Sequence, residues 1–197
     1  CTEGPLLPLL LVWGGSQGSR HINEALWATL PQVLPYAQVL HVVGERDWPQ
    51  WQPKLQAPTA GVSDQMWERY HPVAYLHEEM ALALAAADLT VARAGASTLG
   101  EFPVARLPAI LAPHPGVNQV QNAEYLVNHG GAVLIDDAVL GQQLAPTLLA
   151  LIQDQARRRT MEEALAHLAK PHAAQAIAEQ LFTLAQASIS KPSPRDN

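Results

Sequence analysis

Short apolar runs alternate along the chain with longer segments in which apolar positions recur every three or four residues. The short runs are typical of strands buried on both faces of a sheet, and they cover 9–12, 39–43, 89–91, 109–111 and 132–135. The longer segments are typical of amphipathic helices, and they cover 21–34, 78–87, 98–105 and 119–128. Because strand and helix alternate and such crossovers are right-handed, the sequence predicts an α/β fold, a Rossmann-like doubly wound parallel sheet.

The pattern changes after residue 135, where the strand signal stops and three helices are predicted, over 142–152, 157–168 and 173–187. Helices at the end of such a chain usually pack on the sheet or return toward a neighbouring domain. The last segment, 188–197, is rich in proline, serine and charge and has too little apolar area to order itself. We therefore expect one domain over 1–187 and a disordered tail over 188–197.

The composition fits one well-packed domain, since 48% of the 197 residues are hydrophobic and 15% are charged. The formal net charge of -6 has the wrong sign for neutralising phosphodiester backbones, so nucleic acid is excluded as a partner and an anionic membrane surface is disfavoured. No apolar stretch approaches the roughly 20 residues that a membrane-spanning helix needs. We expect this chain to be soluble and not membrane-bound.

The chain begins with its single cysteine, Cys1, without an initiator methionine or a secretory signal. A lone cysteine forms no internal disulfide, which fits a reducing, cytoplasmic compartment. This start predicts a piece cut from a longer protein. The eight histidines show no HExxH or close paired spacing, so no metal site is predicted and no histidine is chosen as a base.

A glycine-rich turn, residues 14–19, follows the first predicted strand and opens the first predicted helix. Backbone amides and the positive end of the helix dipole meet there, which favours an anion. Glycine lets the backbone approach a phosphate, and Ser16 offers a hydroxyl. The alternative is a tight turn with Ser19 as the helix N-cap. The turn is neither GxGxxG nor the lysine-bearing P-loop, which counts against dehydrogenase and NTPase functions.

A second loop, residues 92–101, also lies between a predicted strand and a predicted helix. Residues 95–98 would present unpaired amides at the helix start, a second anion cradle. Glu101 falls about one turn into the helix, where a carboxylate can accept hydrogen bonds from both hydroxyls of a ribose. The alternative is an acid that favours the helix dipole and contacts nothing. Arg93 would pair either with a phosphate or with a surface acid.

A third loop, residues 113–123, is dense in turn formers and leads into a helix that carries several amides. Asn118, Gln119 and Asn122 offer both donors and acceptors, which the recognition of sugar hydroxyls requires. The alternative is that these amides are ordinary helix-capping residues.

All three loops lie at the C-terminal edge of a predicted parallel strand, where open α/β sheets bind ligands. Two anion cradles, a diol acceptor and an amide-rich loop describe a nucleotide diphosphate sugar. Residues 73–80 would supply a slot for the base, with the Leu76 backbone reading its edge and Met80 packing against its face. The alternative for Met80 is a place in the core.

Three groups of residues, one in each loop, together resemble a known family: 14–20 with Asn23, 93–98 with Glu101, and 118–119 followed by 122–123. They are similar to the UDP-N-acetylglucosamine:lipid-linked muramyl-pentapeptide transferases, family 28 of the two-Rossmann-domain (GT-B) glycosyltransferases. The resemblance spans about residues 7–184 and implies that this chain is the C-terminal, donor-binding domain.

The resemblance also implies roles for single residues. Ser16 and the second-loop amides, with Thr98, would bind the diphosphate. Leu76 and Met80 would frame the uracil, and Glu101 would hold the ribose.

The third loop would read the sugar. Asn118, Gln119 and Asn122 would meet the N-acetylglucosamine hydroxyls, with the Ala96 amide at the hydroxyl that selects this sugar. The full set of expected donor-binding residues is Gly15, Ser16, Gln17, Gly18, Asn23, Leu76, Met80, Arg93, Gly95, Ala96, Ser97, Thr98, Glu101, Asn118, Gln119 and Asn122.

The implied reaction moves N-acetylglucosamine from UDP-N-acetylglucosamine to the 4-hydroxyl of the lipid-linked acceptor, with inversion, in peptidoglycan synthesis. Helix-dipole and amide stabilisation of the departing UDP would replace a metal, so no cofactor is expected. The acceptor site, the candidate base and the membrane-docking surface would belong to an N-terminal domain that this chain lacks. We expect the chain to bind donor without catalysing, to contain no catalytic residue, and to come from a parent that is peripheral on the cytoplasmic face of the plasma membrane.

Three positions depart from the family pattern. Gly116 lies where the family often has an acid, Asn118 where His or Gln is usual, and Pro103 should kink or shorten the helix after Glu101. Two other functions stay open: a stand-alone UDP-sugar-binding subunit that needs a separate membrane partner, and a sugar-nucleotide epimerase. The epimerase would require catalytic acids and a base that the sequence does not place.

Overall fold

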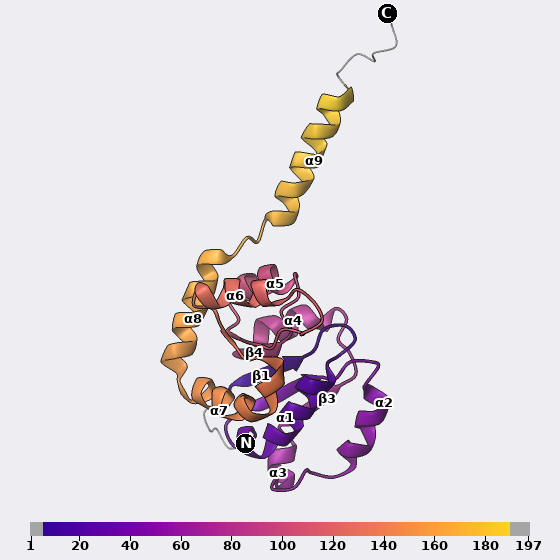
Figure 1. Cartoon of the computed structure of the whole chain (residues 1–197), viewed down its shortest axis with the longest axis vertical. Coiled ribbons are helices and arrows are strands. Elements are labelled where there is room, and N and C mark those ends of the chain that lie inside the picture. The colour runs from indigo at the N-terminus through magenta and orange to yellow at the C-terminus, as the bar shows by residue number, and fades with distance from the viewer. Residues whose placement is uncertain (1–5, 190–197) are drawn as a thin grey trace, which may run out of the picture.

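The computed structural model describes residues 6–189, in which a six-stranded parallel sheet lies between two layers of helices (Figure 1). Its strands run in the order β3-β2-β1-β4-β5-β6, which is the order of the Rossmann fold, so the predicted fold class is confirmed. The strands are β1 (Leu9–Trp13), β2 (Gln38–Val42), β3 (Tyr70–Val73), β4 (Leu89–Ala92), β5 (Ala109–Leu111) and β6 (Ala132–Leu134).

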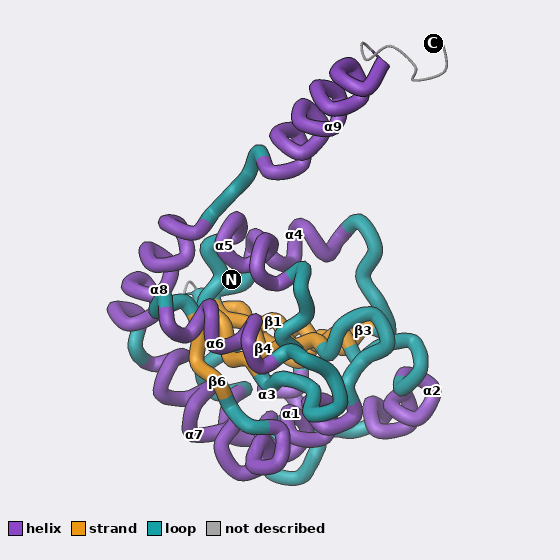
Figure 2. The backbone as a smooth tube through the Cα atoms, turned by 45° about the horizontal axis from the view of Figure 1, so that its top comes forward, coloured by secondary structure: helices purple, strands orange, loops and turns teal. Residues whose placement is uncertain are grey.

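Each face of the sheet is covered by its own helices, and Figure 2 shows the strands between the two layers. Side chains of one strand alternate between the layers: Leu10 and Val12 enter one apolar core, and Leu11 enters the other. This double burial is why the strands read as continuous apolar runs. The first core is covered by α1 (Arg20–Val33) and α7 (Leu140–Gln153), and the second by α4 (Glu79–Ala86), α5 (Thr98–Ala105), α6 (Val120–Asn128) and α8 (Gln155–Leu168).

One strand and several short helices were not predicted. The strand β3 pairs only with β2 and contains Pro72, which cannot donate to a sheet ladder and is therefore tolerated only at such an edge. Its sequence, Tyr-His-Pro-Val, carries no apolar run that would reveal a strand. The helices are single turns with no measurable periodicity: α2 (Trp48–Trp51), α3 (Asp64–Trp67) and two 3₁₀ turns, Gln52–Gln56 and Asp137–Val139.

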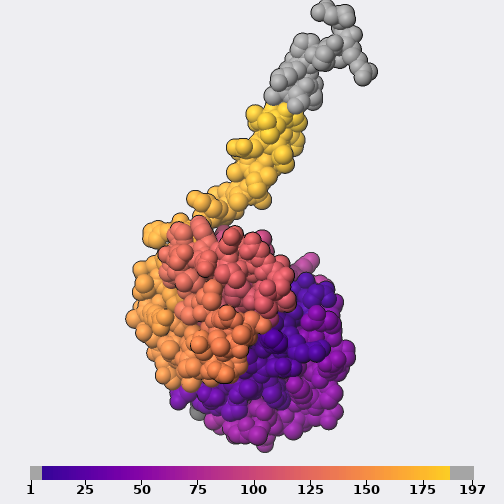
Figure 3. Space-filling view, in the orientation of Figure 1, coloured from indigo at the N-terminus to yellow at the C-terminus, as the bar shows by residue number. Residues whose placement is uncertain are grey.

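The C-terminal helices behave differently from one another. The helix α7 packs along α1, and α8 lies against α5, as expected for helices that end such a chain. In contrast, α9 (Ala173–Ile189) leads away from the body with its apolar side chains exposed (Figures 1 and 3). It continues two residues into the expected tail, and Cys1 and the remainder of that tail lie outside the described residues. None of the described helices is long and apolar enough to cross a membrane.

The sheet order creates a crevice between two neighbouring strands. From β1 the chain continues toward β2, whereas from β4 it continues toward β5 on the opposite side. The loops that leave the carboxyl ends of β1 and β4 therefore diverge, and this switch point is where open α/β sheets bind ligands.

The turn after β1 depends on a close backbone contact between two glycines. Gly18 has φ 76 and Gly44 has φ 96, and a Cβ on Gly18 would overlap the carbonyl oxygen of Val43. We predict that Gly18→Ala lowers the free energy of unfolding by about 2 kcal/mol, because left-handed strain and this overlap add together. Urea unfolding measures it. In the control Gly141→Ala, the new methyl group meets open space in a helix, so stability should stay level or rise by up to about 1 kcal/mol. Equal stabilities of the two variants would contradict this.

Candidate functional site

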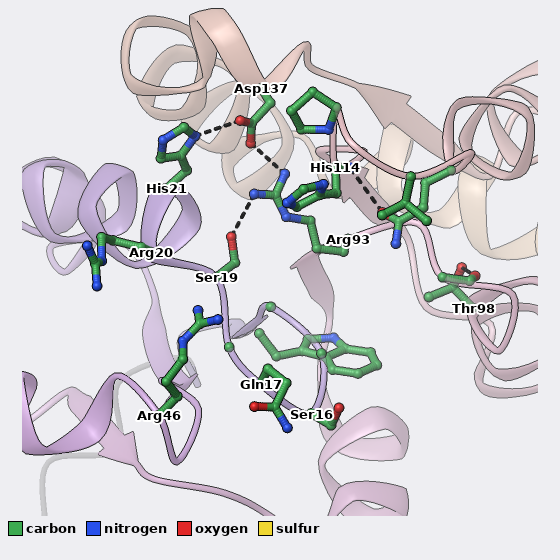
Figure 4. A pocket seen from close by; sticks show the side chains of 18 of the residues that line it. Ser16, Gln17, Ser19, Arg20, His21, Arg46, Arg93, Thr98, His114 and Asp137 are labelled. Carbon is green, nitrogen blue, oxygen red and sulfur yellow. Dashed lines mark hydrogen bonds and ion pairs between the residues drawn. The ribbon is translucent and has the colours of Figure 1, made fainter.

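A cavity of about 580 Å³ lies at the switch point of the sheet (Figure 4). The loops after β1, β4 and β5 form its walls, so the predicted convergence of the three loops is observed. Nine of the sixteen residues expected to bind the donor line it: Gly15, Ser16, Gln17, Gly18, Arg93, Gly95, Ser97, Thr98 and Gln119. The other lining residues are Trp13, Gly14, Ser19, Arg20, His21, Arg46, His114, Pro115, Val117 and Asp137.

The first wall is the glycine-rich turn between β1 and α1. The amide of Gly18 closes the turn on the carbonyl of Gly15, and Ser19 caps α1 by accepting from the Ile22 amide. The amides of Ser16 and Gln17 have no partner among the described residues, and both residues are exposed. The turn therefore offers backbone donors to the cavity.

The second wall is the loop from β4 into α5. The Thr98 hydroxyl donates to the carbonyl of Gly95 at 2.6 Å and so fixes the turn. Within the described chain the amides of Gly95, Ala96 and Ser97 make no hydrogen bond, and α5 begins directly after them. Two sets of free amides, each at the positive end of a helix, therefore lie around one cavity, an arrangement that suits an anion.

Arg93 joins these walls through hydrogen bonds and an ion pair, and it lines the cavity. Its side chain is only 10% exposed. One guanidinium nitrogen, Nη1, donates to the carbonyls of Ala112 and Pro113 and pairs with Asp137, and Nη2 donates to the Ser19 hydroxyl at 2.7 Å. The acid that pairs with Arg93 is therefore buried and does not lie on the surface, and the guanidinium joins loops from four strands. A contact between Arg93 and a phosphate stays a prediction.

Asp137 follows the end of β6 after two intervening residues, and its carboxylate binds two side chains. Its carboxylate pairs with Arg93 through one oxygen and with His21 Nδ1 at 2.6 Å through the other. Burial raises the pKa of Asp137, but the bonds from Arg93 and His21 outweigh burial and hold that pKa below its ordinary value. The ionised carboxylate thus balances charge at the end of the cavity that Figure 4 shows above Ser19.

A buried chain of neutral hydrogen bonds supports the opposite side of the site. The Trp51 indole donates to the Tyr70 hydroxyl at 3.0 Å, and this hydroxyl lies 2.8 Å from His41 Nδ1. The other ring nitrogen of His41 lies 3.0 Å from the Asn23 side-chain oxygen. Since an amide oxygen only accepts, His41 Nε2 carries the proton and Nδ1 accepts from Tyr70. Burial lowers the pKa of His41 to about 3, so the ring stays neutral.

Asn23 continues this chain and does not reach the cavity. It is fully buried, and its amide nitrogen donates to the Val43 carbonyl at 3.0 Å and to Asp47 at 3.3 Å. The prediction that the Asn23 side chain contacts the donor is therefore wrong, because each of its polar atoms has a protein partner. Asp47 in turn accepts from Arg46 Nε at 3.0 Å, which directs the outer nitrogens of Arg46 to the rim of the cavity.

The third wall is the loop from β5 into α6. The Gln119 side-chain oxygen accepts from the His114 amide at 3.0 Å, and Gln119 lines the cavity. Asn122 donates to the Ala94 carbonyl at 3.0 Å, which ties α6 to the second loop. Asn118 is exposed and lies outside the cavity lining. Of the three amides expected to read the sugar, Gln119 alone lines the cavity.

The residues expected to hold the nucleoside lie beyond the cavity lining. Glu101 is exposed in the first turn of α5 and forms no ion pair with any described residue. Leu76 and Met80 are half-buried and pack against the second core, and the exposed Ala96 also lies outside the lining. The uracil, ribose and Ala96 contacts stay predictions.

Several residues at the cavity were not in the expected set. Asp137 follows a predicted strand at the same sheet edge as the three loops, so the rule that found those loops would also have indicated it. Arg46 lies beyond β2 with no motif around it, and His21 was counted only as part of a helix. His114 was inside the third loop, but nothing in the sequence separated it from its turn-forming neighbours.

A Rossmann-type sheet with free backbone amides around its switch point places the chain in the class of doubly wound α/β domains. The family model "Glycosyltransferase family 28 C-terminal domain" matches residues 9–181, and the chain belongs to this family.

Curated relatives agree with this family. The chain is similar to two enzymes named UDP-N-acetylglucosamine--N-acetylmuramyl-(pentapeptide) pyrophosphoryl-undecaprenol N-acetylglucosamine transferase. The one from Roseiflexus sp. (strain RS-1) is 41% identical over 90% of this chain and 44% of its own length. The one from Chlorobium phaeobacteroides is 36% identical over 91% of this chain and 48% of its own length. The chain therefore spans about half the length of the curated relatives it matches.

Solved structures share the fold. The crystal structure of Acinetobacter baumannii MurG superposes with a TM-score of 0.77 at 23% identity, over 92% of this chain and 51% of that one. The calicheamicin glycosyltransferase CalG4 superposes with a TM-score of 0.63 at 18% identity, over 95% and 46%. Both likenesses support one half of a GT-B fold.

The Arg93 junction should be costly to break. We predict that Arg93→Lys lowers the free energy of unfolding by about 3 kcal/mol, because a single ammonium cannot replace a guanidinium that reaches four partners and would leave Asp137 poorly compensated. Urea unfolding at neutral pH measures the loss. The matched control is Arg159→Lys, on an exposed position of α8, for which a change below about 0.5 kcal/mol is expected. A similarly small change in the free energy of unfolding for Arg93→Lys would contradict the proposed role of the Arg93 junction.

The buried histidine predicts a loss of stability in mild acid. The pKa of His41 is about 3 in the folded chain and 6.5 is its ordinary value, so both states are neutral above about pH 6.5. Between these values only the unfolded state takes up the proton, and the free energy of unfolding should fall by up to about 1.4 kcal/mol per pH unit as the pH drops. Urea unfolding measures the free energy of unfolding at pH 6 and at pH 5. Between these two pH values the unsubstituted chain should lose about 1 kcal/mol more of this free energy than His41→Gln, whose side chain cannot titrate. Imidazole NMR signals of His41 that titrate near pH 6.5 would disprove the mechanism.

Proposed function

We propose that the chain is the donor-binding half of an inverting glycosyltransferase that moves N-acetylglucosamine from UDP-N-acetylglucosamine to the lipid-linked muramyl-pentapeptide of peptidoglycan synthesis. The observation that carries the proposal is the pair of amide cradles, one after β1 and one after β4, around a single cavity at the switch point. The family supports the donor class, and the printed activity of the curated relatives supports the transferred sugar and the acceptor.

The diphosphate would lie between the two cradles. The free amides of the first turn and of the second loop would bind it, together with the Ser16 hydroxyl, while the Thr98 hydroxyl keeps the second turn in shape. Arg20 and Arg46 at the rim would add positive charge, since the charge of Arg93 is balanced by Asp137. These dipoles and cations would stabilise UDP as it departs, without a metal.

The nucleoside would extend from the diphosphate past the cavity. Glu101 would accept from the ribose hydroxyls, and the half-buried Leu76 and Met80 would frame the uracil. The sugar would face the third loop, where Gln119 lines the cavity.

Catalysis would require a second domain. We propose that the acceptor, the general base and the membrane-docking surface belong to the half of the parent enzyme that this chain does not span, and that the parent works on the cytoplasmic face of the membrane. The chain by itself would then bind donor without transferring the sugar.

Calorimetry on the 197-residue chain tests the proposal. UDP and UDP-N-acetylglucosamine should both bind, and Glu101→Ala should lower both affinities about tenfold because the ribose loses a charged hydrogen-bond acceptor. Glu163→Ala, on an exposed position of α8, is the matched control and should leave both affinities unchanged. Well-folded chain that binds no UDP would refute the donor site, and an unchanged affinity of Glu101→Ala would refute the ribose contact alone.

A further inference from the structure

His114 brings an imidazole ring to the cavity, and the proposed function gives it no task. It lies in the loop after β5, directly beyond the two carbonyls that Arg93 fastens, and it lines the cavity (Figure 4). Its backbone amide donates to the Gln119 side-chain oxygen. The loop is therefore held by Arg93 before His114 and by Gln119 after it.

The ring is held in one protonation pattern by its own loop. The Gly116 amide donates to His114 Nδ1 at 3.0 Å. A ring nitrogen that accepts a hydrogen bond carries no proton, so the neutral imidazole must carry its proton on Nε2. Among the described residues Nε2 has no partner. The loop therefore presents one oriented N–H donor that the protein does not use.

Glycine at position 116 is what allows the ring to lie so close. A Cβ there would stand 3.2 Å from His114 Cε1 and 3.3 Å from Nδ1, tighter than ordinary van der Waals contact. A larger side chain at this position would push the imidazole away. Gly116 and the placement of His114 thus form one feature of this loop.

The charges around the cavity indicate what this donor meets. The amide cradles and the rim cations Arg20 and Arg46 lie on the other loops, where they suit a diphosphate. The third loop offers neutral groups, His114 Nε2–H and the side-chain nitrogen of Gln119, whose oxygen is occupied by the His114 amide. Neutral donors suit hydroxyl oxygens, which carry no charge to balance.

We propose that His114 donates its Nε2–H to a hydroxyl of the sugar in the bound nucleotide sugar, and that Gly116 is the positioning residue that makes this contact possible. The proposal rests on the proposed donor function. In this proposal the sugar contact is assigned to His114, whose N–H donor is already oriented. Asn118, to which the sequence assigned such a contact, is exposed and lies outside the cavity lining.

Comparison of two ligands separates the sugar from the rest of the donor. In calorimetry on the 197-residue chain, His114→Phe keeps a ring but has no N–H, so the affinity for UDP-N-acetylglucosamine should fall roughly five- to tenfold while the affinity for UDP stays within about twofold. His114→Gln, whose terminal amide still offers a donor, should retain most of the affinity. His172→Phe, between α8 and α9 and outside the cavity, is the matched control and should change neither value.

The possible outcomes are distinct. An equal loss for both ligands in His114→Phe would overturn the sugar contact and move it to the diphosphate. Unchanged UDP-N-acetylglucosamine binding in His114→Phe would overturn the assignment while UDP binding leaves the donor function standing. Absence of UDP binding by the unsubstituted chain would overturn the donor function and this assignment together.

Nitrogen-15 NMR of the unliganded chain tests the positioning without any ligand. His114 should show the tautomer with its proton on Nε2, and Gly116→Ala should shift the ring toward a mixture of tautomers. In calorimetry the same variant should weaken UDP-N-acetylglucosamine more than UDP. A proton on Nδ1 of His114 in the unsubstituted chain would overturn the proposal.

Discussion

The guanidinium of Arg93 holds together the loops on which this site depends. Each of these loops leaves a different strand at the same edge of the sheet. A planar group with several donors can satisfy carbonyls, a hydroxyl and a carboxylate at once, which an ammonium cannot do. The cost of burying its charge is offset because Asp137 is ionised beside it and is also held by His21. In the structure without ligand, this junction therefore connects the loops that form the cavity.

A second network supports the same cavity by different physics. The chain of bonds from Trp51 to Asn23 is neutral, and burial keeps His41 uncharged, so each donor has a single acceptor and the direction of every bond is determined. It ends at Asp47, which directs Arg46 outward to the rim. Charged and neutral networks therefore support different walls, and Arg20 and Arg46 place positive charge at the rim.

This arrangement divides the cavity by chemistry. Backbone amides at two helix starts and the rim cations suit a diphosphate, whose charge does not depend on which base or sugar is attached. The third loop carries neutral donors and acceptors, which suit a polyol. In this chain Gly116, which leaves room for the His114 ring, and the exposed Asn118 both lie in the second part.

The sequence by itself determined the parallel α/β fold, five of the six strands and the three loops that converge on one edge, because double burial and helix periodicity are local patterns that survive in a linear chain. It did not reveal β3, since an edge strand with Pro72 needs no apolar run. Only the tertiary structure decided which polar side chains serve the cavity and which serve the protein. Asn23 and Arg93 are occupied by distant partners such as Asp47 and Asp137, and pairings across the sheet leave no trace in residue spacing.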